Sequence, residues 1–137
     1  AGYEWYEISN WAKPGHESRH NVLYWDQADY RGFGCAAHSH ESGRRWWNVR
    51  TPDRYIEVID RGETAEAASE TLDAETRRFE GLQLALRTRE GVLRDSFSSD
   101  TLELLDAMVV DHPTDPARVV LTRRGRLMAN EVSLRLR

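Results

Sequence analysis

The first regular stretch of the chain is Tyr3-Glu4-Trp5-Tyr6-Glu7-Ile8, in which aromatic and aliphatic residues alternate with acidic ones closely enough to predict a β-strand. The polar pair Ser9-Asn10 and then Lys13-Pro14-Gly15 end this strand, because proline and glycine favour turns. Residues 18–25 are expected to form a short helix with Ser18 as its N-cap, and an extended segment is the alternative. The chain therefore begins as a mixed α+β structure.

Two more strands, residues 30–37 and 44–49, are predicted on either side of a polar turn at residues 41–43. A helix is expected to start at Thr51-Pro52-Asp53, which offers a capping hydroxyl, a proline at the first helical position and an early acid. Gly62 is expected to end this helix. Its predicted buried stripe consists of Tyr55, Ile56 and Ile59.

The second part of the sequence is mostly helical by its apolar spacing. A helix is predicted from Asp73 to Gly91, and a second one behind Asp100 and Glu103, which have the spacing of a capping box. Residues 111–116 are predicted to form a loop, residues 118–121 a strand, and Thr122 the N-cap of a last helix over residues 123–136. The residues expected to pack are Phe79, Leu82 and Leu86, then Leu102, Leu105 and Val109, then Met128, Val132 and Leu136. Helix, helix, short strand and helix are the outline of a small winged-helix-like module.

The composition divides the chain into two regions. All five tryptophans precede residue 50, and the net negative charge belongs to the part after residue 55. The apolar periodicity breaks over residues 60–72, so we expect one region over residues 1–60 and another over residues 61–137.

The composition also excludes several classes of protein. The chain has 137 residues and a single cysteine, Cys35, so it cannot close an internal disulfide or hold a four-cysteine zinc or iron–sulfur site. One thiol favours a cytoplasmic location, and the sequence offers neither a signal peptide nor a transmembrane segment. A net charge of −4 argues against a nucleic-acid partner, since phosphate binding usually needs a basic surface.

The densest chemistry lies in His20-Asn21-Val22-Leu23-Tyr24-Trp25. His20 and Tyr24 share a face whether the segment is helical or extended. A neutral imidazole beside aromatic rings could ligate a haem iron axially while the rings cover the macrocycle. The alternative is a histidine that is hydrogen-bonded inside an aromatic core.

Further motifs extend this pattern over nearly the whole chain. They are Tyr6-Glu7-Ile8-Ser9-Asn10-Trp11-Ala12, Pro14-Gly15, Ser18, Tyr30, Gly32, Gly34, Ala37-His38-Ser39, Trp46-Trp47-Asn48, Pro52, Tyr55, Leu121-Thr122 and Gly125-Arg126. Together they resemble the C-terminal part of the HemW-type haem chaperones, a branch of the radical SAM proteins long grouped with oxygen-independent coproporphyrinogen III oxidases. The His-Asn-x-x-Tyr-Trp pattern favours the chaperone branch.

This resemblance implies a fold and a cargo. Residues 1–60 would be the C-terminal end of a partial α/β (radical SAM) barrel, and residues 61–137 a helical, winged-helix-like domain. The cargo would be haem, with His20 as the axial ligand of its iron and Asn21 as the orienting hydrogen-bond partner. Tyr24 and Trp25 would pack against the ring, and His38 would be a further cofactor-binding residue.

The resemblance also implies that the chain is a fragment. Radical SAM chemistry needs a Cys-x-x-x-Cys-x-x-Cys motif to hold a [4Fe–4S] cluster for S-adenosylmethionine, and Cys35 alone cannot supply it. We therefore expect the cluster and S-adenosylmethionine in an N-terminal barrel of the parent, no catalysis by this piece, and recipient haem proteins as partners. Two alternatives stay open: part of an oxygen-independent coproporphyrinogen III oxidase, and a winged-helix nucleic-acid-binding module.

The remaining candidates are weaker. His38-Ser39-His40 would place two imidazoles on one side of a strand, as a metal chelate requires, but no third ligand is evident. Arg44-Arg45 beside Trp46-Trp47 could meet haem propionates, although a solvated hairpin end is the more frequent use of such arginines. Arg123, Arg124 and Arg126 invite the nucleic-acid interpretation. The edge of the strand at residues 3–8 predicts a homodimer formed by strand pairing.

Overall fold

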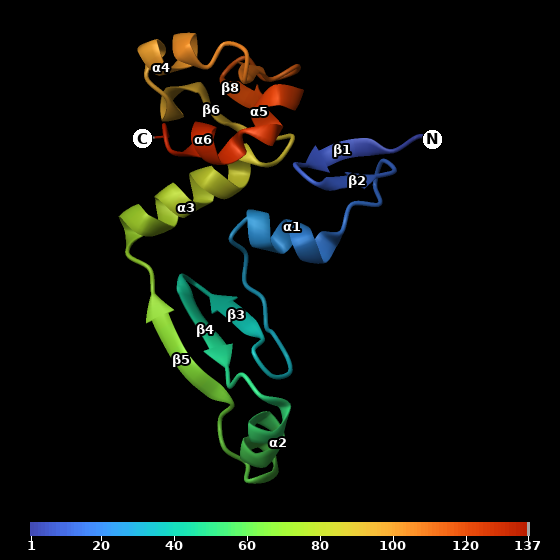
Figure 1. Cartoon of the computed structure of the whole chain (residues 1–137), viewed down its shortest axis with the longest axis vertical. Coiled ribbons are helices and arrows are strands. Elements are labelled where there is room, and N and C mark those ends of the chain that lie inside the picture. The colour runs from blue at the N-terminus through green and yellow to red at the C-terminus, as the bar shows by residue number, and fades with distance from the viewer. Residues whose placement is uncertain (137) are drawn as a thin grey trace. The chain divides into compact units, whose positions relative to one another are not determined.

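The computed structural model describes residues 1–136, which form two compact units. The first unit contains Ala1–Asp26 and the chain from Arg78 onward, and the second contains Gln27–Arg77. The second unit is therefore, in sequence, an insertion within the first (Figure 1). The mixed α+β class predicted from the sequence is confirmed.

The first unit begins with a hairpin of β1 (Glu4–Glu7) and β2 (Asn10–Ala12), in which Trp5 lies opposite Trp11. The other edge of β1 meets residues 87–89: Ile8 N–H donates to Arg87 O at 3.0 Å, and Tyr6 O accepts from Arg89 N–H at 3.1 Å. The predicted strand at residues 3–8 is confirmed, and β2 completes it as a hairpin. Part of its outer edge is occupied within the chain, and the homodimer stays a prediction.

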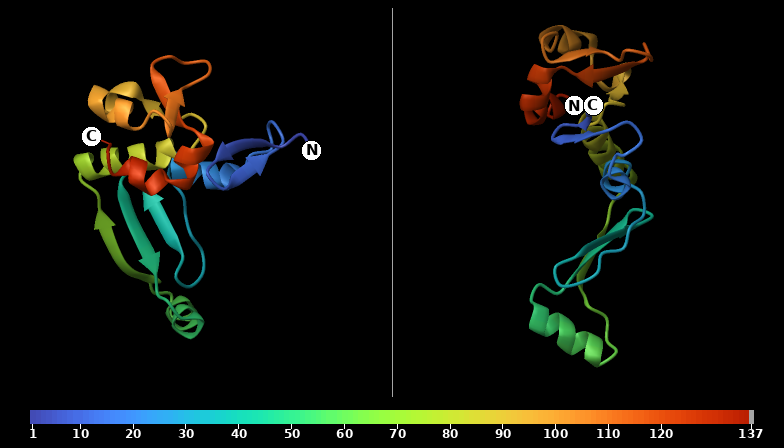
Figure 2. Two further views of the ribbon diagram at one scale, coloured as in Figure 1. Left: turned by 45° about the horizontal axis from the view of Figure 1, so that its top comes forward. Right: turned by 90° about the vertical axis from the view of Figure 1, so that its right-hand side faces the viewer.

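A small sheet, helix α1 (Arg19–Trp25) and five further helical segments form the rest of this unit (Figure 2). The sheet has the strand order β6-β8-β7 and is antiparallel throughout. Its strands are β6 (Val92–Leu93), β7 (Val109–Asp111) and β8 (Arg118–Leu121). The five further helical segments are α3 (Ala74–Leu86), of which the part from Arg78 belongs here, η1 (Arg94–Ser96), α4 (Ser99–Leu104), α5 (Arg123–Leu127) and α6 (Ala129–Ser133).

The core of the first unit lies between this sheet and its helices. Apolar side chains from widely separated segments meet there. A sheet of only three short strands is stable in water only when its apolar face is packed in this way. The buried members are Leu86, Val92, Phe97, Leu105, Val109, Val119, Leu121, Ala129, Val132 and Leu136.

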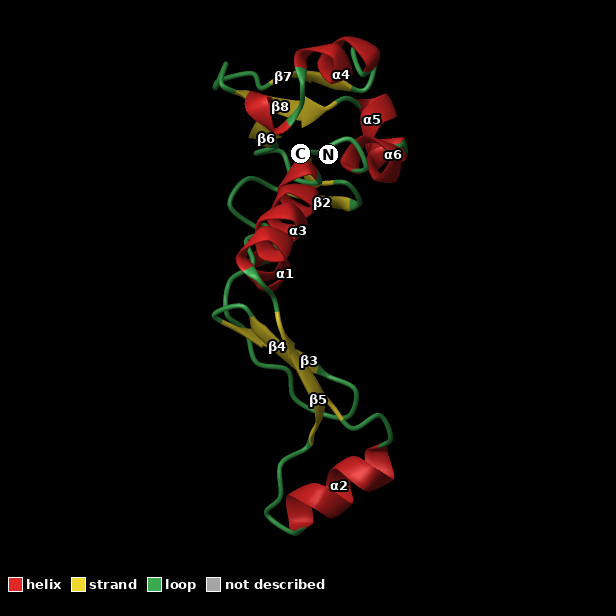
Figure 3. Cartoon of the chain, turned by 90° about the vertical axis from the view of Figure 1, so that its left-hand side faces the viewer, coloured by secondary structure: helices red, strands yellow, loops and turns green. Residues whose placement is uncertain are grey.

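The second unit is a three-stranded antiparallel sheet with one helix (Figure 3). β3 (His38–Glu41) and β4 (Arg44–Asn48) form a hairpin, and β5 (Glu66–Thr71) pairs with the other side of β4. The hairpin turn places Ser42 at a φ of 51° and Gly43 at 87°, the two positive values of a type I′ turn. α2 (Pro52–Asp60) lies in the connection between β4 and β5.

The strand predicted for residues 30–37 is wrong, because the pairing strand is β3 and the preceding residues form a loop. The backbone turns at Gly34, with a φ of 97°, and at Ala36, with a φ of 57°, so extended geometry is lost. The loop is held by Asn48, whose Nδ2 donates to Gly34 O at 2.9 Å. Gly32 is required because a Cβ there would lie 2.2 Å from His38 O.

Several other expectations differ from the structure in detail. The junction expected at residues 60–72 contains β5, and Ile56 and Ile59 of α2 are exposed while Val58 is buried. The helix after residue 98 is capped by Ser98 and ends at Leu104, so Val109 belongs to β7. The last helix is divided at Met128 into α5 and α6.

The domain boundary expected at residue 60 falls inside the second unit, between α2 and β5. The division into residues 1–60 and 61–137 thus differs from the compact units, and as a statement about the parent protein it stays a prediction. Residue 137 lies outside the described part of the chain. None of the helices in residues 1–136 combines the length and apolar character that a membrane span requires.

Candidate functional site

The segment with the densest chemistry forms α1 (Arg19–Trp25), the helix predicted from the sequence. Ser18 caps it, because its Oγ accepts from Asn21 N–H at 3.4 Å. The Ser18 N–H in turn donates to the Tyr6 hydroxyl at 3.2 Å, which anchors the helix start to β1. None of the seven helical residues is fully buried, so α1 presents most of its side chains to solvent.

His20 and Tyr24 stand one helical turn apart on the exposed face of α1. The Tyr24 Oη lies 3.1 Å from His20 Nε2, and the two rings meet edge to face with centroids 5.0 Å apart. Both residues are exposed. The imidazole can therefore be reached from solution, and the alternative of a histidine locked in an aromatic core does not hold.

Trp25 belongs to the other face of the helix. Its ring meets the Tyr6 ring edge-on at 5.7 Å between centroids, and Val22 lies beside it. These residues line a cleft of about 260 Å³ within the first unit, together with Glu17, Asp26, Ala85, Thr88, Arg89, Glu90, Gly91 and Arg118. Trp25 thus packs α1 against β1, while Tyr24 contacts His20 on the exposed face of the helix.

Charged side chains line the polar side of this cleft. Arg89 lies 3.1 Å from the Glu17 carboxylate and 3.5 Å from that of Glu90, while Arg118 donates to the carbonyls of Glu90 and Gly91. The pKa of the Glu17 carboxyl lies below its ordinary value, first because its own backbone N–H donates to it. Burial raises this pKa, and the charge and hydrogen bond of the Arg89 guanidinium lower it further. Tyr6, Arg89 and Arg118 were not predicted as neighbours of this cleft, because no local pattern connects residues so distant in the chain.

Asn21 is half-buried, and its backbone N–H completes the Ser18 cap. The side chain that meets the His20 ring is that of Tyr24, so an orienting role of Asn21 stays a prediction. His38 lies in the second unit, exposed on β3 and stacked on Trp47 with ring centroids 5.8 Å apart. Its part in cofactor binding also stays a prediction.

The weaker candidates are engaged in structural contacts. His40 is buried, with Nδ1 donating to Ala28 O at 3.1 Å and Nε2 accepting from Gly43 N–H at 3.2 Å, so it does not form a chelate with His38. Within residues 1–136, no cluster of three or more His, Cys, Asp or Glu residues could hold a metal ion. Arg44 and Arg45 pair with Glu66 and Glu70 across the sheet.

The donor set of α1 fits an iron porphyrin and does not fit an iron–sulfur cluster. An accessible imidazole is the usual protein ligand of haem iron, and the exposed Leu23 and Tyr24 beside it supply apolar surface. The single thiol, Cys35, is half-buried in the loop before β3 and falls two short of the three ligands that a radical SAM cluster needs.

Comparison with known proteins shows several close relatives. Over 134 residues the chain is 39% identical to the haem chaperone HemW of Mycobacterium tuberculosis, and this covers 96% of the chain and 34% of that protein. It is 34% identical to HemW of Bacillus subtilis over 141 residues and 30% identical to HemW of Escherichia coli over 142 residues, each covering 96% of the chain. No family model matches the sequence.

The chain is HemW-like. It spans about a third of the length of these relatives, 34% to 37%. Among solved structures, the HemW-like chain is similar to coproporphyrinogen III oxidase (HemN) of Escherichia coli, a radical SAM enzyme, with a TM-score of 0.63 and 16% sequence identity. This likeness covers 97% of the chain and 36% of the enzyme, and at this identity it concerns the fold.

Proposed function

We propose that this HemW-like chain is the haem-holding part of a haem chaperone that hands haem to recipient haem proteins. The observation that carries the proposal is the His20 imidazole, which is exposed on α1 and accompanied by Tyr24. The relatives that match 96% of the chain are named haem chaperones, which supports the same function.

In this proposal His20 is the axial ligand of the haem iron. Tyr24 and Leu23 lie on the same exposed side of the helix and would contact the porphyrin. Trp25 supports the site from behind by packing on Tyr6, and Asn21 contributes through the helix cap. His38 is a separate exposed imidazole that a binding experiment has to distinguish from His20.

The parent protein would hold a [4Fe–4S] cluster and S-adenosylmethionine outside the residues present here, because the chain has a single cysteine. For the same reason this chain by itself would perform no radical chemistry. The fold likeness to coproporphyrinogen III oxidase supports a second candidate, in which the parent oxidatively decarboxylates a porphyrinogen in haem biosynthesis. The identities of 30% to 39% to haem chaperones favour the first candidate.

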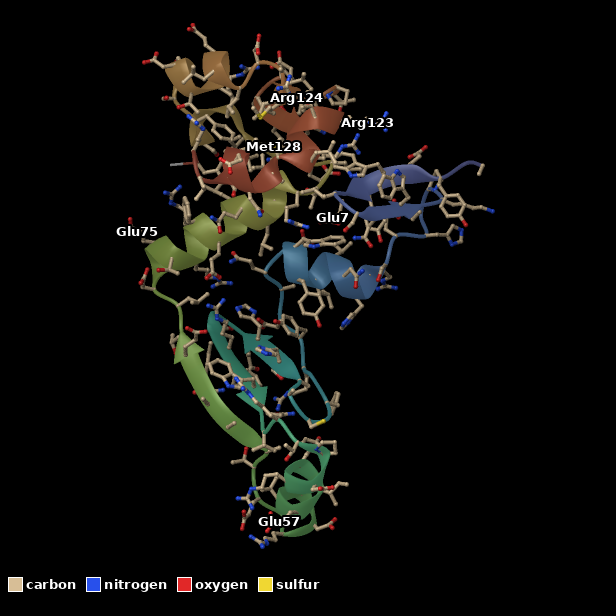
Figure 4. The ribbon with its side chains drawn as sticks, in the orientation of Figure 1. Glu7, Glu57, Glu75, Arg123, Arg124 and Met128 are labelled. Atoms are coloured by element: carbon tan, nitrogen blue, oxygen red, sulfur yellow. The ribbon has the colours of Figure 1, made fainter. Side chains whose placement is uncertain are left out.

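We also infer a winged-helix-like arrangement in the C-terminal part, supported by a helix, β6, α4 and the β7–β8 hairpin following one another with the sheet order β6-β8-β7. A nucleic-acid role is disfavoured, because α4 carries Asp100 and Glu103 where a recognition helix would need basic residues. Arg123 and Arg124 lie outside that helix, in α5 (Figure 4).

The test is a titration of the chain with haemin, followed by absorption and electron paramagnetic resonance. We expect a histidine-ligated spectrum that His20→Ala abolishes, while His16→Ala, which removes another exposed histidine of the same unit, leaves it unchanged. His38→Ala is measured separately, because His38 is itself a predicted cofactor-binding residue. An unchanged spectrum in His20→Ala would overturn the assignment. Anaerobic turnover of coproporphyrinogen by a longer protein that contains this sequence would favour the second candidate.

A further inference from the structure

The hydrogen bond between Tyr24 and His20 involves the ring nitrogen that a haem iron would use. The Tyr24 Oη lies 3.1 Å from Nε2, at the tip of the imidazole. Nδ1 is next to Cβ and close to the helix backbone, where a flat macrocycle would collide with α1. Nε2 is therefore the nitrogen that can approach iron, and Tyr24 contacts that same atom.

The tautomer of His20 decides which group donates in this hydrogen bond, and iron is excluded in either case. When the ring proton is on Nδ1, the Tyr24 hydroxyl donates to the in-plane lone pair of Nε2, which is the lone pair that iron needs. When the proton is on Nε2, that N–H donates to the Tyr24 oxygen and Nε2 has no lone pair to offer. Iron therefore binds Nε2 only after this hydrogen bond has opened.

We propose that the Tyr24 hydroxyl competes with haem iron for Nε2 of His20 and thereby weakens the hold on haem to a level that permits hand-over. The inference rests on the proposed function and assigns Tyr24 a part in releasing haem. The ring of Tyr24 keeps the imidazole in place through the edge-to-face contact, and its hydroxyl sets the strength of the iron bond.

The size of the effect follows from the competition. An exposed neutral hydrogen bond contributes little free energy, so molecules with the Tyr24–His20 hydrogen bond outnumber those without it only moderately. Haem iron can bind only the molecules without it, so the apparent affinity is reduced by the fraction of such molecules. Removal of the hydroxyl is expected to tighten haem binding about three- to tenfold. Binding of an iron-free porphyrin does not use the lone pair and is expected to stay the same.

The test compares the chain with its Tyr24→Phe variant, which keeps the ring and removes the hydroxyl. Both are titrated with haemin and with iron-free protoporphyrin IX, and haem transfer to an excess of an apo-globin is followed by absorption. We expect a lower dissociation constant and slower transfer for haemin alone. Tyr3→Phe, which removes another exposed tyrosine hydroxyl of the same unit, is the matched control and is expected to change neither.

Three outcomes distinguish the ideas. Equal or weaker haem binding by Tyr24→Phe would overturn the competition. An equal gain for haemin and iron-free porphyrin would also overturn it, because the change would then act on packing rather than on the iron bond. A histidine-ligated spectrum that persists in His20→Ala would instead overturn the assignment of His20 as the haem ligand, on which the proposed function is built. Because Tyr24 is exposed, circular dichroism is expected to show an unchanged fold in every variant.

Discussion

Glu7 and Arg87, 80 residues apart in the chain, form an ion pair in which the carboxylate is almost completely buried. Glu7 Oε1 accepts from Arg87 Nε at 2.9 Å, and Oε2 accepts from Ser9 N–H at 3.0 Å and from Asn10 Nδ2 at 2.6 Å. One side chain thus connects the end of β1, the hairpin turn and the segment after α3 (Figure 4).

Replacement of this carboxylate is expected to destabilise the first unit. In Glu7→Gln one of the two acceptor oxygens is replaced by an NH2 group. This NH2 group would face hydrogen-bond donors, either Arg87 or Ser9 and Asn10, and those donors would lose their acceptor. We expect a loss of about 2 to 3 kcal/mol in the free energy of unfolding, measured by urea denaturation. Glu4→Gln, an exposed position on the same strand, is the control, and equal stability of both variants would contradict the prediction.

The same carboxylate predicts how stability depends on pH. Burial raises the pKa of Glu7, but the hydrogen bonds from Ser9 and Asn10 and the charge of Arg87 outweigh this and hold the pKa below its ordinary value of 4.5. Since the pKa is lower in the folded state, the contribution is complete above the unfolded value and is lost as pH falls through the folded pKa. The free energy of unfolding, measured at a series of pH values, should therefore decrease as the pH is lowered, and this decrease should be smaller in Glu7→Gln.

Gly125 is expected to tolerate no side chain although it lies in a helix. A Cβ at this position would lie 1.9 Å from Met108 O, a backbone atom that cannot turn aside. Alanine would gain about 1 kcal/mol of helix propensity, but the collision outweighs this gain. We expect Gly125→Ala to lose about 2 kcal/mol of stability in thermal unfolding, while Arg124→Ala at the exposed neighbouring position changes it little. A stabilised Gly125→Ala variant would refute this packing.

Asn48 is expected to hold the loop that precedes β3. Its Nδ2 donates to Gly34 O at 2.9 Å, and nearby the amide of Ala37 donates to the same carbonyl at 3.4 Å. Asn48→Ala should cost about 1 to 2 kcal/mol and speed hydrogen exchange at Ala36 and Ala37. Thr71→Ala, at an exposed position on β5, should leave exchange in this loop unchanged; if it did not, Asn48 would have no special role.

The parts of the fold that were predicted correctly carry local signals. Ser18 and Thr122 each accept the capping hydrogen bond expected of them, and the strand at residues 118–121 follows from its β-branched run. The exposed pair of His20 and Tyr24 also follows from local spacing, because residues four apart share a helix face.

The parts that were missed are decided by distant partners. β5 has the small, polar sequence of a linker and becomes a strand because β4 pairs with it. Val109 fits a helical stripe, but its pairing with Leu121 places it in β7. Met128 was expected to pack in the core and is exposed. The last helix is divided at this residue into α5 and α6, and the buried residue of the following segment is Val132. None of these partners can be identified from spacing alone.

The separation of Glu7 from Arg87 also matters during synthesis. A ribosome that adds about 5 to 20 residues per second delivers the arginine roughly 4 to 16 seconds after the glutamate. Until then the carboxylate of Glu7 has no positively charged partner at this site, and an isolated two-stranded hairpin has little stability in water. The inserted residues 27–77 are synthesised completely in that interval, so we expect them to collapse before the β1–β2 hairpin is fixed by Arg87.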